Sequence, residues 1–175
     1  MTPHVLMTLM LLFSAPDARD PEASPNLRPL NATAAWLITE GLARSSTLAA
    51  LVDRIERSDV IAYVETESCR NRSWAGRLRF VTAAGGRRFL RIGVCAELGR
   101  TVQIAMLAHE LQHAVEIAGS DAYQVEAVRA LYERIGVRRG RIDGVVCFDT
   151  AAAVAVGRAA LRDARTSRAT LVLGY

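Results

Sequence analysis

Residues 102–118 constrain the fold of this chain more than any other segment does. Apolar side chains recur there at the i, i+3, i+4 spacing that places them on one face of an α-helix. They are Ile104, Leu107, Ala108, Leu111, Ala114, Val115 and Ala118. Most helices of globular proteins are stabilised by burying such a face, so another part of the chain must cover it. The segment therefore predicts a core helix.

The residues before this helix predict the layer that covers it. The stretch VIAYVETE at 60–67 is rich in β-branched and aromatic residues, as strands are. Apolar and polar residues alternate through 76–94, with Gly85 and Gly86 near the middle, where a hairpin would turn. These features predict three strands that are mostly antiparallel.

Three more helices are predicted from the same kind of spacing. Residues 30–59 carry apolar side chains with helical periodicity, a second helix follows the break at Gly119 and Ser120, and a last one begins near Thr150. The candidate N-terminal caps are Ser45, Ser46 or Thr47 for the second half of the first helix and Asp121, paired with Gln124, for the second. Residues 136–144 are predicted to form a basic loop. The pattern as a whole predicts an α+β domain, in which the middle helices form an antiparallel pair.

Length and composition fit one folded domain that follows a short leader. The chain has 175 residues, of which 51% are hydrophobic and 23% charged, and residues 30–175 are long enough to bury a core. Residues 1–29 contain an apolar run at 5–15 and then a segment rich in Pro, Asp and Ser, which resembles a signal peptide and a flexible linker. The run is too short to span a membrane. We expect an exported protein of a bacterial type, with a docked N-terminal helix in a cytoplasmic protein as the alternative.

The positive charge is carried by arginine alone, because the chain contains no lysine. The net charge is +4, and the arginines cluster in two places. These clusters are Arg87, Arg88 and Arg91, and Arg138, Arg139 and Arg141. Aromatic residues make up only 6% of the chain and no helix is rich in arginine, so we expect no nucleic-acid partner. A solvated surface, or a rim that faces an acidic ligand, is the preferred interpretation.

The three cysteines are Cys69, Cys95 and Cys147, and their spacing contains no CxxC pair. A zinc site made of thiolates is therefore not indicated. An odd number leaves at least one thiol unpaired in a monomer. One disulfide between Cys69 and Cys95, which flank the predicted hairpin, and three buried reduced thiols are the two alternatives.

The core helix also carries the sequence His-Glu-Leu-Gln-His at 109–113. Residues four apart lie one turn above each other on a helix, so His109 and His113 can direct their imidazole nitrogens at the same point. Zinc accepts two such ligands, and Glu110 lies where it can take a proton from water on the open side of the metal. The alternative is a helix face with two hydrogen-bonded histidines, but these histidines border an apolar stripe, where polar groups need partners.

This segment resembles the active-site helix of the zincin superfamily of zinc metallopeptidases. The strand expected just before it, at 87–94, is consistent with the sheet edge that holds an extended peptide in such enzymes. The order of SDV, AYVE, HELQH, LYERIG and FDTAAA is similar to that of small bacterial exported proteins. The specific match covers the middle third of the chain and implies a minimal zincin-like domain.

The resemblance also implies a third zinc ligand. Metzincins use a later histidine and a glycine three residues after the second histidine, but Glu116 occupies that position and no histidine follows His113. Gluzincins use a glutamate on the next helix, and a level antiparallel pair of helices would place Glu126 opposite His113. Glu133 would lie two turns too far along, roughly 10 Å away. Asp121 is the competing ligand, because some zincins use an aspartate after the second histidine.

The function implied by this resemblance is hydrolysis of a peptide or protein substrate with Zn²⁺ as cofactor. Glu110 would act as general base toward metal-activated water and then protonate the leaving amine. Tyr123 is a candidate donor to the oxyanion, whereas Tyr132 falls on the apolar face of its helix. Ala130 stands where gluzincins often carry an aspartate that orients a histidine. The alternatives are a zinc-binding protein with little turnover and a non-enzymatic interaction domain, and the sequence sets no oligomeric state.

Overall fold

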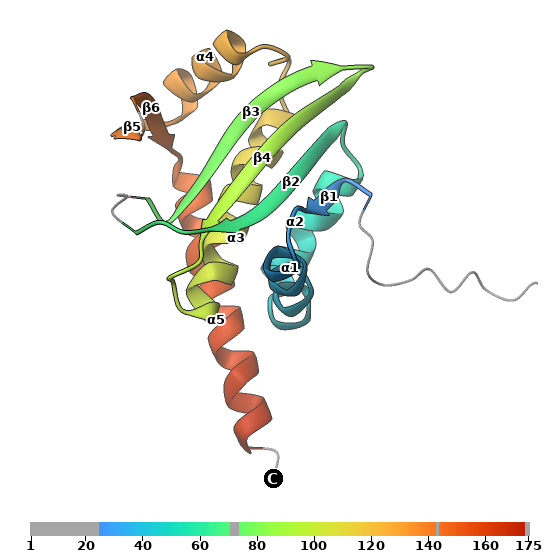
Figure 1. Cartoon of the computed structure of the whole chain (residues 1–175), viewed down its shortest axis with the longest axis vertical. Coiled ribbons are helices and arrows are strands. Elements are labelled where there is room, and N and C mark those ends of the chain that lie inside the picture. The colour runs from blue at the N-terminus through green and yellow to red at the C-terminus, as the bar shows by residue number, and fades with distance from the viewer. Residues whose placement is uncertain (1–24, 71–73, 143, 174–175) are drawn as a thin grey trace, which may run out of the picture.

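The computed structural model of the chain describes residues 25–70, 74–142 and 144–173 (Figure 1). The elements in chain order are β1 (Leu27–Pro29), α1 (Ala32–Arg44), α2 (Ser46–Glu56), β2 (Val60–Glu67), β3 (Gly76–Ala84), β4 (Arg87–Cys95), α3 (Arg100–Ala118), α4 (Val125–Ile135), β5 (Val137–Ile142), β6 (Val145–Asp149) and α5 (Ala151–Leu173). The predicted α+β class is confirmed. The apolar run expected to be a signal peptide lies outside the described residues.

The main sheet has the strand order β1-β2-β4-β3. The predicted hairpin of β3 and β4 is confirmed, but β1 with β2 and β2 with β4 pair in parallel, so the sheet is not mostly antiparallel. The difference arises because β4, and not β3, lies beside β2. The connection from β2 therefore passes to the far edge of the sheet before the chain returns along β4. The two edge strands are β1 and β3.

Strand β1 extends the sheet into residues that were expected to be linker. Leu27 is buried, and the side-chain amide of Asn26 donates hydrogen bonds to the backbone carbonyls of Ile55, Glu56 and Ser58. These contacts join the start of the fold to the end of α2. The predicted boundary at residue 29 therefore falls after the first strand of the domain.

The predicted helix at 30–59 is divided at Ser45. This residue has extended backbone angles, and its hydroxyl accepts a hydrogen bond from the amide of Leu48, so it caps α2 as one of the predicted alternatives. Asp163 of α5 accepts hydrogen bonds from the same junction, at Ser45, Ser46 and the amide of Thr47. The break is thus stabilised both by a local cap and by a distant helix.

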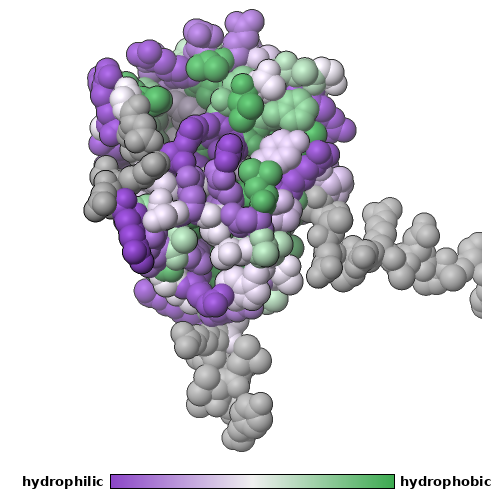
Figure 2. Space-filling view, viewed as in Figure 1, coloured by the Kyte–Doolittle hydropathy of each residue, from purple (hydrophilic) through white to green (hydrophobic). Residues whose placement is uncertain are grey.

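Helix α3 packs against one face of the sheet, as Figure 1 shows, and its buried apolar face forms the centre of the core. The opposite face of the sheet carries ion pairs, between Arg91 and Glu65 and between Arg77 and Glu67. Figure 2 shows hydrophilic residues spread over this side of the molecule. The sheet is therefore covered on one face and open to solvent on the other, which explains the alternation in the sequence.

Helix α5 packs closely against α3 through small residues. Within residues 151–167 of the helix, the buried positions are Ala153, Gly157, Ala160 and Ala164. A Cβ atom at Gly157 would lie 3.3 Å from Cβ of His109, so the absence of a side chain there lets the two helices approach at the histidine. In the described part of the chain, no helix combines the length and the apolar character that a membrane span requires.

The region predicted as a basic loop, 136–144, begins a two-stranded hairpin of β5 and β6. Helix α4 packs against this hairpin and β3, so it does not form the level antiparallel pair with α3 that was predicted. The predicted Asp121–Gln124 cap is also wrong, because α4 begins at Val125 without a side-chain cap. The pairing shifts between Arg138 and Gly140, which leaves Arg139 in a bulge, and Gly140 has a φ of 142° that favours glycine.

Cys69 and Cys95 form a disulfide with a Cα–Cα distance of 5.2 Å, which confirms the first of the two alternatives for the cysteines. Cys147 is free and half-buried. The first arginine cluster is not a surface stripe, because Arg88 is only 2% exposed and Arg91 pairs with Glu65.

Candidate metal centre

The two histidines of the core helix lie with their rings facing one carboxylate. The ring centroids of His109 and His113 are 5.0 Å apart. Nε2 of His109 is 3.4 Å, and Nε2 of His113 is 3.9 Å, from Oδ1 of Asp149. Each of the three residues offers one ligand atom within 4.8 Å of the others. Two nitrogens and one oxygen thus converge on a single point.

The surroundings of Oδ1 of Asp149 show whether these residues fit a metal ion. The atom is buried and has no hydrogen-bond partner, while Oδ2 faces Arg139 at 3.6 Å from its Nε. A buried carboxylate oxygen without a partner is costly, and a cation between it and the two imidazoles would satisfy it. Two imidazoles and one carboxylate form a ligand set that zinc uses in catalytic sites. The residues present therefore fit zinc.

Hydrogen bonds from the start of α5 orient one of the two histidines. Asp149 ends β6, and Thr150 caps α5 by accepting a hydrogen bond from the amide of Ala153. The Thr150 hydroxyl donates to Oε1 of Glu116 at 2.6 Å, and Oε2 of Glu116 accepts from Nδ1 of His113 at 2.9 Å. This chain fixes the His113 ring so that Nε2 faces Asp149. A carboxylate behind a ligating histidine is a common feature of zinc sites.

The titratable groups of the site shift the pKa values of one another. Burial opposes the charged form of Glu116, but hydrogen bonds from His113 and Thr150 outweigh it and lower its pKa. Burial likewise opposes protonation of His113, but the hydrogen bond to Glu116 and the nearby carboxylates raise its pKa. The pKa of His109 is lowered, first by burial and then by the charge of His113. Metal binding at the pair would therefore displace a proton from His113.

Glu110 is buried between α3 and the start of β3. It is 5% exposed, and burial, with a smaller contribution from the charge of Asp149, raises its pKa to about 7. A Cβ atom at Gly76 would lie 2.5 Å from Oε1 of Glu110, so only glycine allows β3 to pass this carboxylate without displacing it. A carboxyl group with this pKa can both accept and release a proton near neutral pH.

The structure does not bring the other predicted site residues into this group. Glu126 is exposed at the start of α4, and the residue of α4 that lies beside the His113 ring is Tyr132, with the ring centroids 5.3 Å apart. Asp121 is also exposed. The Tyr123 hydroxyl donates to Asp59 at 2.9 Å, and the Arg88 guanidinium lies over the Tyr123 ring. The Tyr132 hydroxyl donates to the backbone carbonyl of His113 at 2.8 Å, which agrees with its predicted core position.

Asp149 was not predicted beside the histidines, because a level antiparallel pairing of the helices on either side of Gly119 and Ser120 would place Glu126 opposite His113. The β5–β6 hairpin instead carries the chain back to the histidines. One signal was present in the sequence. Asp149 and Thr150 stand directly before a helix whose small residues recur at 153, 157, 160 and 164, which indicates close packing on another helix.

A second group of possible ligand atoms consists of Cys69, Cys95 and Glu97. Both thiols are used in the disulfide, so the group offers no thiolate to a metal.

Comparison of the chain with protein-family models, with curated proteins and with solved structures finds no match.

Proposed function

We propose that this protein is a zinc-dependent peptide hydrolase whose ligands are His109, His113 and Asp149. The observation that supports this most is that Oδ1 of Asp149 is buried, accepts no hydrogen bond and faces Nε2 of both histidines. Asp149 takes the place that we expected for Glu126. An aspartate that follows the second histidine is compatible with the resemblance to zincins, although the gluzincin-like ligand set is replaced.

A bound zinc ion supplies Lewis acidity toward water and toward a carbonyl oxygen. Glu110 then accepts a proton from water and returns it to the leaving amine, for which a pKa of about 7 is suited. Glu116 holds the orientation of His113, and Thr150 holds Glu116. The side chains of this constellation come from α3 and from the junction of β6 with α5.

The edge strand β3 is the proposed guide for an extended peptide. It begins at Gly76 against Glu110, and its outer edge pairs with no described strand. A peptide that adds to this edge would run past the general base. Residues 87–94 were expected to hold the extended peptide, but they form β4, which lies inside the sheet. We therefore assign this role to β3. The disulfide supports an exported protein, since such bonds persist in oxidising compartments.

The experiment that tests this proposal has a metal arm and an activity arm. Wild type, Asp149→Ala, Glu126→Ala and Asp121→Ala are dialysed against the same weak chelator, and their zinc content is measured. We expect about one zinc in every protein except Asp149→Ala. Loss of zinc in Glu126→Ala alone would restore the original ligand set, and absence of zinc from wild type would leave a non-enzymatic interaction domain.

The activity arm separates a hydrolase from a zinc-binding protein with little turnover. A mixture of unstructured peptides is incubated with zinc-loaded wild type and with zinc-loaded Glu110→Gln, and the products are identified by mass spectrometry. We expect cleavage by wild type and a loss of at least 100-fold in Glu110→Gln, since general acid–base catalysis contributes on the order of 10²–10⁴-fold. Equal product in both samples would contradict the role of Glu110.

A further inference from the structure

A cavity of about 330 Å³ lies directly beside the proposed metal centre. Its walls are the β5–β6 hairpin and the first turns of α5, and Asp149 contributes to its lining. Val137 and Val154 add apolar surface, and Arg139 and Arg158 add two guanidinium groups. Asp149 is the one acidic residue among the described residues that line the cavity, and its two oxygens face the histidines and Arg139.

Arg139 is directed to this cavity by the bulge in β5. The bulge leaves Arg139 without a partner position on β6, and such irregularities redirect a side chain out of the regular alternation of a strand. Nε of Arg139 lies 3.6 Å from Oδ2 of Asp149, and the side chain is 62% exposed. Its contact with Asp149 is therefore loose and leaves donors available to a ligand.

Arg158 reaches the same cavity from α5. Residues 151, 154, 155 and 158 lie on one face of that helix, and all of them line the cavity. The described structure gives Arg158 no hydrogen bond or ion pair, so its charge has no partner within the described chain.

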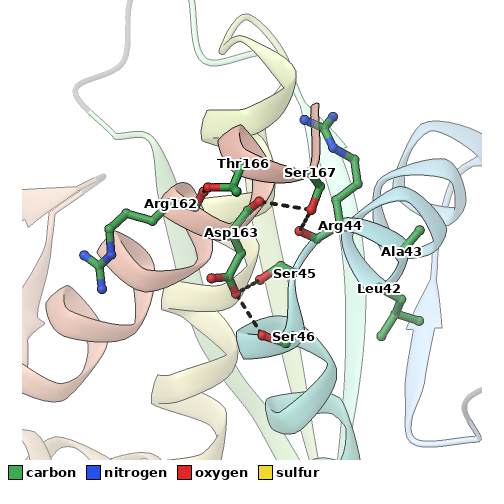
Figure 3. Close-up of a pocket in the computed structure, with 9 residues that line it drawn as sticks. All are labelled: Leu42, Ala43, Arg44, Ser45, Ser46, Arg162, Asp163, Thr166 and Ser167. Atoms are coloured by element: carbon green, nitrogen blue, oxygen red, sulfur yellow. Dashed lines mark hydrogen bonds between the residues drawn. The ribbon is translucent and has the colours of Figure 1, made fainter. Parts of the chain in front are cut away.

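Arg162, one turn further along α5, provides a contrast. It lines a different cavity, of about 510 Å³, between α5 and the junction of α1 and α2 (Figure 3). There the neighbouring Asp163 is held by hydrogen bonds from Ser45 and Ser46. Arg162 therefore matches Arg158 in residue type and helix but lies outside the cavity beside Asp149.

We propose that the cavity beside Asp149 binds a carboxylate of the peptide substrate through Arg139 and Arg158. The inference rests on the proposed hydrolase function and specifies its substrate class. Guanidinium groups match carboxylates in charge and in hydrogen-bond geometry, and the apolar walls would contact the carbon atoms beside the carboxylate. A substrate whose carboxylate occupies this cavity lies next to Asp149, so the cavity selects peptides that carry a negative charge close to the cleaved bond. The carboxylate comes from the C-terminus or from an aspartate or glutamate side chain.

The test uses a peptide that zinc-loaded wild type cleaves. One derivative is amidated at its C-terminus, and others carry Asn or Gln in place of each Asp or Glu. Their kcat/KM values are compared for wild type, Arg158→Ala and the control Arg162→Ala, with zinc content measured in each. We expect removal of the bound carboxylate to lower kcat/KM roughly tenfold in wild type and Arg162→Ala but little in Arg158→Ala, as for loss of a charge-assisted hydrogen bond. The derivative that shows the effect identifies the C-terminus or a side chain as the source.

A preference that survives in Arg158→Ala, or derivatives that are all cleaved equally by wild type, would overturn the inference while leaving the hydrolase intact. Cleavage of no peptide would contradict the hydrolase itself, and a binding measurement then decides the cavity. Zinc-loaded Glu110→Gln is titrated with N-acetylglycine and with N-acetylglycinamide, and the Nε–H signals of its arginines are followed by NMR. Shifts caused only by the carboxylate, and lost in a second protein that also carries Arg158→Ala, support the site. Equal responses to both probes exclude it.

Discussion

Two clusters of polar side chains are buried along α3, and they differ in how completely they are paired. Near the end of the helix, Arg88 donates all five of its N–H groups, to both carboxylate oxygens of Asp59 and to the backbone carbonyls of three residues. Those carbonyls belong to Ile117, Ala118 and Ser120. In the middle of the helix, Oδ1 of Asp149 faces two histidines and accepts no hydrogen bond.

Both clusters lie against the same helix, so the contrast does not come from a poorly packed region. Arg88 donates to two of the carbonyls that a helix leaves unpaired at its C-terminus, Ile117 and Ala118, and to Ser120 just beyond α3, so each of its N–H groups has an acceptor within the fold. The cluster at Asp149 has its outer groups paired, through Glu116 and Thr150, but Oδ1 of Asp149 at its centre accepts no hydrogen bond. This contrast is what stabilisation of the fold by the first cluster would produce, and it supports the proposal that the second cluster holds a ligand.

The largest effect is expected where the paired cluster is broken. Arg88→Met removes the donor of five hydrogen bonds, to Asp59 and to the carbonyls of Ile117, Ala118 and Ser120, so we expect the free energy of unfolding to fall by about 3 to 5 kcal/mol. Urea unfolding followed by circular dichroism measures this change. Arg91→Met is the control, because its half-exposed pair with Glu65 should contribute less than about 1 kcal/mol. Equal losses in the two variants would contradict a special role for Arg88.

The next largest effect is expected on zinc affinity, when Glu116 of the cluster at Asp149 is replaced. Glu116→Ala removes the acceptor that orients His113, so we expect zinc affinity to fall about 10- to 100-fold. Competition with a fluorescent zinc chelator gives the dissociation constant. Glu116→Gln keeps an acceptor without the charge and should lie between the two. A wild-type affinity in Glu116→Ala would show that helix packing alone orients the ring.

Replacement of Asp149 itself is expected to change the free energy of unfolding by less than Arg88→Met does, and in the opposite direction. In metal-free protein at a pH where both histidines are neutral, Asp149→Asn replaces a buried carboxylate oxygen that accepts no hydrogen bond, so we expect the free energy of unfolding to rise by about 1 kcal/mol. Urea unfolding in the presence of a chelator measures it. With zinc added, wild type should gain stability and the variant should not. A variant that is destabilised without metal would mean that the two clusters serve the same structural purpose.

The smallest effect is pH-dependent and uses a third, paired carboxylate. Burial opposes the charge of Asp163, but hydrogen bonds from Thr47, Ser45 and Ser46 lower its pKa. A lowered pKa stabilises the fold above the ordinary value, near pH 4, and this stabilisation is lost as the pH falls through the pKa of the folded state. Asp163→Asn should therefore be less stable than wild type by about 0.5 kcal/mol at pH 7, with a smaller difference at pH 3. A difference that does not depend on pH would exclude this carboxylate as its source.

The parts of the molecule that follow from local spacing were predicted from the sequence. The periodicity of 102–118 located α3, the paired glycines located the turn between β3 and β4, and the positions of His109 and His113 placed both rings on one side of the helix. Each of these inferences depends on residues that are at most a few turns apart.

The parts that failed depend on contacts between distant segments. Strand β1 is three residues long and exists because β2 offers it an edge, which no local pattern reveals. The β5–β6 hairpin was hidden because its first strand is rich in arginine and glycine and so resembles a loop. The position of Asp149 beside the histidines was not predicted for the same reason, since the chain returns to them only through that hairpin.

A metal bound by His109, His113 and Asp149 would also affect the stability of the segment that lies between these residues in the chain. Asp149 follows His113 by 36 residues, and the segment between them contains α4, β5 and most of β6. An ion held by these residues would act as a reversible cross-link that closes this segment into a loop, with a gain in stability that grows only slowly with loop length. Chelation should therefore speed hydrogen exchange in α4 and the β5–β6 hairpin first, while β2 and β4 keep their protection.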